Sequence, residues 1–128
     1  MDPITAAIVA AISAGVTKVG EQIISDAYNI LKDLLGKKFG AKSKVVKAVK
    51  ELEANPKSAA RKEVVREEVA AVKADQDQEL LQIAQSLLKS LKALPGGTQI
   101  IQTATGDQNI QIAGDSNTLN MGTSRTKK

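Results

Sequence analysis

The sequence lacks the side chains on which most catalytic and metal sites depend. It contains no Cys and no His, which excludes disulfides, thiolate metal sites and the commonest general base. Aromatic residues are nearly absent, with one Tyr, one Phe and no Trp, so recognition of single-stranded nucleic acid by base stacking is not expected. We therefore predict a protein that is not an enzyme and that needs no metal and no cofactor.

The N-terminus also lacks the signs of a secretory or membrane segment. It reads "MDPITAAIVAAISAGV", with an acid where a signal peptide carries basic residues. The uncharged stretch, residues 3–17, is shorter than the ~18 apolar residues typical of a membrane-spanning helix. These features favour a cytoplasmic protein, and the net charge of +4 favours anionic partners without naming one.

Helical periodicity is present in the first 95 residues. A first helix starts with Asp2 as cap and Pro3 in its first turn, and its apolar pattern runs to about Gly36. Gly15 and Gly20 are places where it bends or breaks. The expected caps of three further helices are Ser43, Ser58, and Asp75 or Asp77. One apolar stripe per helix and short connections predict an all-α four-helix bundle over residues 1–95, its first helix whole or broken.

A repeat marks the remaining residues, 96–128. "GTQIIQTA" (97–104) and "GDQNIQIA" (106–113) agree at Gly, Gln, Ile, Gln and Ala, five positions of eight. Each unit fits a short β-strand followed by a glycine turn, and so short a strand needs partners. Residues 97–120 contain no Pro, Lys or Arg, a composition that suits cross-β stacking with ladders of Asn and Gln side chains. Basic residues return only at the C-terminal end.

We interpret this tail as a self-assembly motif. In it amide side chains form ladders, isoleucines form a dry seam and glycines permit turns. The expected motif residues are Ile101, Gln102, Gly106, Gln108, Asn109, Ile110, Gln111, Ile112, Gly114 and Asn117. Three other interpretations remain: a disordered polar tail, a strand region packed on the bundle, and a finite β-solenoid. The last would make the protein a structural homo-oligomerisation protein with helical heads.

The segment "NIQIAGDSN" (109–117) resembles bacterial amyloid signalling motifs, which overlap RHIM-like and fungal prion-forming motifs. Its core "IQIAG" departs from the RHIM pattern by the inserted Ala113. The N-terminal "MDPITAAIVAAISAG" and "DAYNILKDLLGKKFG" resemble the start of a Bell-type, HeLo-like helical domain. The resemblance implies an effector of regulated cell death. A receptor with a matching motif would template the tail, and the clustered helical domains would move to the inner face of the cell membrane and disrupt it.

Two features of the helical part fit this mechanism. The apolar first helix is the expected membrane-active element, through Ile4, Ile8, Ile12 and Val16, although it should be buried in the bundle at rest. Residues 37–50 contain six lysines and no acid, which favours anionic lipid headgroups. The expected headgroup residues are Lys37, Lys38, Lys42 and Lys44. A solvated helix face is equally compatible with this stretch, whereas its lack of Arg argues against nucleic acid as a partner.

Overall fold

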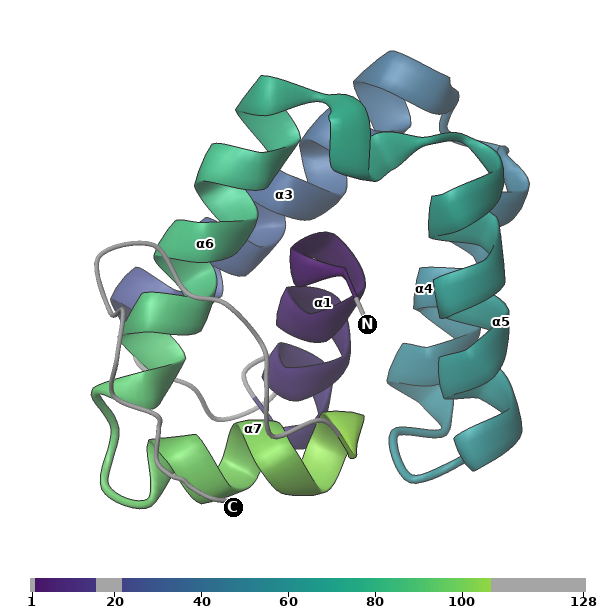
Figure 1. Ribbon diagram of the computed structural model, residues 1–128. Coiled ribbons are helices and arrows are strands. Elements are labelled where there is room, and N and C mark those ends of the chain that lie inside the picture. Colours follow the sequence, from purple (N-terminus) through teal and green to yellow (C-terminus); the bar gives the residue numbers. More distant parts are fainter. Residues whose placement is uncertain (1, 16–21, 107–128) are drawn as a thin grey trace, which may run out of the picture.

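The structure, a computed structural model, describes residues 2–15 and 22–106. In this part of the chain all regular structure is helical (Figure 1). The elements are α1 (Pro3–Ser13), α3 (Gln22–Phe39), α4 (Lys44–Ala54), α5 (Ala59–Ala71), a 3₁₀ turn η1 (Ala74–Gln76), α6 (Gln78–Lys92) and α7 (Gly97–Thr105). The predicted all-α class is confirmed for this part, which contains six α-helices. The prediction is a four-helix bundle with its first helix whole or broken, and α7 is an additional helix.

Four helices begin where the sequence predicts a side-chain cap. Asp2, Ser43, Ser58 and Asp77 each accept a hydrogen bond from the backbone N–H three residues later. These bonds satisfy amides that a helix leaves without an internal partner, and each cap contributes about 1 kcal/mol. Of the two candidates for the last cap, Asp77 is the one that starts α6. The starts of these elements therefore follow from local side-chain chemistry.

Helix α1 forms the centre of the molecule. Figure 1 shows α3 and α6 on one side of it, the α4–α5 hairpin on the other, and α7 crossing near its C-terminal end. Every side chain from Ile4 to Ile12 is buried, including Thr5, whose hydroxyl donates to Asp2 Oδ2 at 2.7 Å. The prediction that the first helix is buried in the bundle is confirmed. Val16, predicted to share its apolar face, lies outside the described residues.

In the described residues, the long first helix of the sequence interpretation contains α1 and α3, so the broken form of this prediction is confirmed. Helix α1 ends at Ser13, and α3 continues through Gly36 to Phe39 instead of ending near that glycine. The buried face of α3 consists of Ile24, Tyr28, Leu31 and Leu35. Ile23 and Ile30 also belong to the apolar pattern of this stretch, but they are exposed, because they fall outside the one face that the helix buries.

The prediction of a strand at residues 97–104 is wrong, because Gly97–Thr105 forms helix α7. Ile101 and Ala104 lie three residues apart on one helical face and pack into the core beside α1 and α6. Thr and Ile are β-branched and favour strands, but packing of this face against α1 and α6 stabilises a helix instead. The helical body therefore includes residues beyond the boundary predicted at 95.

Candidate functional site

The feature with the clearest functional potential is the buried helix α1 together with the elements that cover it. Helix α1 carries no charged residue, and Ile4, Ile8 and Ile12 lie 0–1 % exposed. Burial of an isoleucine stabilises the folded state by about 1.5–3 kcal/mol relative to exposure. The helix can therefore meet another apolar phase only after its covers have moved.

Helix α7 is one of these covers, and packing rather than intrinsic preference stabilises it. The N-cap residue that precedes it, Gly96, gives no side-chain cap, and three of the nine residues of α7 are Thr, a residue of modest helix propensity. Gly97 is packed so closely on the end of α6 that a Cβ there would lie 2.0 Å from the Leu91 carbonyl oxygen. Gly106 then ends α7 with a φ of 68°, a left-handed conformation that glycine adopts without strain.

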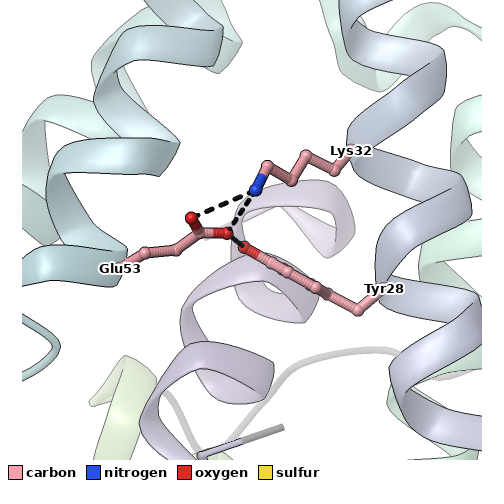
Figure 2. A network of polar contacts seen from close by, with 3 residues as sticks. All are labelled: Tyr28, Lys32 and Glu53. Atoms are coloured by element: carbon pink, nitrogen blue, oxygen red, sulfur yellow. Dashed lines mark hydrogen bonds and ion pairs between the residues drawn. The ribbon is translucent and has the colours of Figure 1, made fainter. Parts of the chain in front are cut away.

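A polar network fixes α3 against α4 on another side of the core (Figure 2). The Tyr28 hydroxyl donates to Glu53 Oε2 at 2.5 Å, and Lys32 Nζ lies 2.8 Å from the same oxygen. Burial of Tyr28, with the carboxylate of Glu53 beside it, raises the pKa of the phenol far above its ordinary value. The phenol therefore remains a neutral donor, and Glu53 holds both side chains of α3.

A second ion pair attaches the C-terminal part of α3 to the start of α6. Lys38 Nζ lies 3.0 Å from Glu79 Oε1 and 3.1 Å from Asp77 Oδ2. The hydrogen bonds that Lys38 donates to Glu79 and to Asp77 raise the pKa of Lys38. The pKa of Asp77 is lowered, first by the backbone N–H of Leu80 that it caps and then by Lys38. Lys38 thus already has acidic partners within the fold.

The other predicted headgroup residues lie on the surface. Lys37, Lys42 and Lys44 are exposed, and Lys37 lines a hollow between α3 and α4 together with Lys32 and Lys50. The sequence prediction missed Lys50 and the network of Tyr28, Lys32 and Glu53. Tyr28 and Lys32 are four residues apart on one helix, a usable signal for a shared face, but nothing local indicates their partner on α4.

The structure separates the predicted motif residues into two groups. Ile101 is buried in α7, Gln102 is half-buried in the same helix, and Gly106 ends it. The remaining predicted residues, Gln108, Asn109, Ile110, Gln111, Ile112, Gly114 and Asn117, lie outside the described residues. The first copy of the repeat is thus part of the helical body.

Among the helices of the described segments, none has both the length and the apolar character needed to cross a membrane. Helix α1 is apolar but has 11 residues, which corresponds to a rise of ~17 Å against a hydrocarbon core of ~30 Å.

Comparison with known proteins gives a family for the whole chain. No curated protein and no solved structure matches it. A family model described as the Het-E N-terminal domain matches residues 1–128. This match covers the helical body and the repeat-bearing tail together. The chain therefore belongs to the Het-E N-terminal domain family, which is linked to fungal heterokaryon incompatibility.

Proposed function

We propose that this protein is an effector of regulated cell death. In this proposal a receptor with a matching motif templates amyloid assembly of the tail, the helical domains cluster, and the clustered domains disrupt an anionic membrane. Membership of a family linked to heterokaryon incompatibility supports the cell-death role. The resemblance of residues 109–117 to amyloid signalling motifs, and of the N-terminal residues to Bell-type domains, supports the mechanism.

The observation that carries the proposal is the position of α7. This helix contains the first copy of the tail repeat, and it packs directly on α1. If assembly converts this copy into a β-strand beside the second copy, Ile101 and Ala104 must leave the core that they share with α1. Assembly of the tail and exposure of the apolar helix would then be one coupled event.

The membrane step follows from the composition of α1. Its residues Ile4–Ile12 are apolar except for Thr5, so the exposed helix would partition into a bilayer. A single copy is too short to span the hydrocarbon core. Clustering by the tail supplies many copies at one place, and several short apolar helices inserted side by side would thin and perturb the bilayer.

Seeded assembly of the full chain tests this function. Fibrils grown from a peptide of residues 106–117 are added to the purified protein, and thioflavin fluorescence and negative-stain microscopy follow the product. We expect unbranched fibrils decorated with helical domains. Ile110→Asp should abolish growth because the added charges would stack on one another, whereas Thr123→Asp, which adds the same charge beyond the motif, should assemble.

Two other results would contradict the proposal. In the first, the protein stays monomeric in the presence of seeds, which would mean that its assembly is not templated. Particles of fixed stoichiometry would instead support a structural homo-oligomerisation protein whose tail forms a finite β-solenoid.

A further inference from the structure

A small hollow lies on the surface between α3 and α4, and it has a strongly basic lining. Its volume is about 360 Å³, and its walls include Lys32 and Lys37 of α3 and Lys50 of α4. Asp33 is the one acidic residue in the lining. The charge of Lys32 is offset by its ion pair with Glu53, so Lys37 and Lys50 against Asp33 leave the lining with a net positive charge.

The two outer lysines have no competing partner among the described residues. Lys37 and Lys50 are exposed, and neither makes an ion pair in this part of the chain. Lys38 behaves differently, because its ammonium group is engaged by Asp77 and Glu79. Lys37 is therefore available to an anionic ligand, whereas the adjacent Lys38 is already paired.

The third lysine, Lys32, is held in place by Glu53. Both carboxylate oxygens of Glu53 contact Lys32 Nζ, at 2.8 and 3.1 Å, and Tyr28 donates to the same carboxylate. Figure 2 shows Lys32 and Tyr28 reaching from one helix toward Glu53 on the facing one. Because Lys32 is tied down within the fold, one wall of the hollow is pre-organised.

The small residues in the lining also leave room for an anion. Gly36, which has no side chain, and Ala41, which has only a methyl group, line it and leave the space open between the lysines. The lining reaches Val46 in the first turn of α4, a turn without acidic residues.

We propose that this hollow is a binding site for a phosphate-bearing anion, with Lys37 and Lys50 as direct ligands and the Lys32–Glu53 pair as a fixed wall. Lysine binds phosphate as a point charge, and the several acceptor oxygens of a phosphate group can take hydrogen bonds from both lysines at once. The volume is at the small end of the range of ligand pockets. A soluble phosphate ester and the phosphate of a lipid headgroup share this chemistry, so the site does not depend on assembly of the tail.

A charge-matched pair of double variants tests the site in the full chain. Lys37→Gln with Lys50→Gln removes the two direct ligands, and Lys42→Gln with Lys44→Gln removes two exposed lysines of the same run that do not line the hollow. Pyrophosphate is titrated into each protein at physiological salt, and binding is followed by calorimetry and by amide chemical shifts. All four lysines are on the surface, so both double variants should fold, as circular dichroism would verify.

We expect the first double variant to weaken pyrophosphate binding by about tenfold or more, through loss of two charge-assisted contacts. The second should change it by less than about threefold, as for diffuse surface charge. The shifted amides should belong to residues 32–50. Equal losses in the two variants, or no binding of pyrophosphate by the unmodified protein, would overturn the proposal.

Vesicles then distinguish the two sources of phosphate. Phosphatidic acid exposes a terminal phosphate, whereas phosphatidylserine vesicles adjusted to the same surface charge do not. Preference for phosphatidic acid that is lost in Lys37→Gln with Lys50→Gln would assign the site to a lipid headgroup. Pyrophosphate binding without that preference would assign it to a soluble phosphate ester. Neither result depends on fibril formation, so failure of this site and failure of the proposed effector function remain distinguishable.

Discussion

Tyr28 of α3 and Glu53 of α4 are joined by a hydrogen bond of 2.5 Å, although 25 positions separate them in the sequence. The accepting oxygen, Oε2, also lies 2.8 Å from Lys32 Nζ. One carboxylate thus holds two side chains of the neighbouring helix. This contact fixes α3 against α4 beside the lysine-lined hollow and makes the phenol a sensitive reporter of the folded state.

Tyr28 should resist ionisation as long as the protein is folded. Burial and the carboxylate of Glu53 raise its folded-state pKa above the unfolded value of about 10. Stability from this group is therefore complete below pH 10 and is lost as the pH rises further, because the unfolded state releases the proton first. The chain has one Tyr and no Trp, so the ultraviolet absorbance of ionised tyrosine reports on this group alone. If Tyr28 ionised at the same pH in the native protein as in urea, its burial and its hydrogen bond to Glu53 would be contradicted.

Removal of the Tyr28 hydroxyl should weaken the fold without changing it. Tyr28→Phe keeps the buried ring, while Glu53 retains Lys32. Because the lost hydrogen bond has a carboxylate acceptor at a partly exposed site, we expect a decrease of about 1–2 kcal/mol in the free energy of unfolding. Urea denaturation measures it. An unchanged midpoint would show that the hydroxyl is solvated rather than bonded to Glu53.

A matched pair of isoleucines tests the burial of α1. Ile8 is 1 % exposed and Ile23 is 74 % exposed. Ile8→Ala should lower the free energy of unfolding by about 2–5 kcal/mol, because it leaves a cavity at the centre of the core. Ile23→Ala should lie within about 0.5 kcal/mol of the unmodified protein, as usual for surface sites. Similar effects of the two variants in urea denaturation would mean that α1 is not the central helix.

Much of the helical body was predictable because its signals are local. The caps at Asp2, Ser43, Ser58 and Asp77 depend on a side chain and an amide three residues apart, and all four helices start where they predict. Helix α7 was not predictable in the same way. Its sequence favours a strand, and its helical state depends on contacts with α1 and α6, which are distant in the sequence.

Which surface lysines are available for binding also could not be predicted from the sequence. The sequence identifies a run of lysines, but it does not show that Lys38 contacts Asp77 and Glu79 while Lys37 lines a hollow with Lys50 of α4. Those neighbours come from α4 and from the start of α6. Long-range packing therefore decides which lysines are available.

Two glycines provide a selective test of α7. At Gly97 a Cβ would lie 2.0 Å from the Leu91 carbonyl oxygen, whereas at Gly36 it would make an ordinary contact of 3.9 Å with Ala41 Cα. Gly97→Ala should therefore displace α7 and speed hydrogen exchange of its amides. Gly36→Ala should leave α7 protected and stabilise α3 by up to ~1 kcal/mol. Full protection of α7 in Gly97→Ala would show that its docking tolerates the added methyl group.

The same pair examines the link between α7 and assembly. If α7 must leave α1 before the repeat becomes β-structure, Gly97→Ala should shorten the lag of unseeded fibril growth, and Gly36→Ala should not. If α7 is displaced in Gly97→Ala alone and the two variants still have equal lag times, release of α7 does not limit assembly.

The most direct test of the central claim is dye leakage from anionic vesicles during seeded assembly of the full chain. We predict that seeds of residues 106–117 trigger leakage by the unmodified protein and by Thr123→Asp, with the amides of α1 losing their protection from exchange over the same period. Ile110→Asp and Gln111→Lys should cause no leakage while their helical domains remain folded. Fibrils that form while α1 stays protected and the vesicles stay intact would contradict the account.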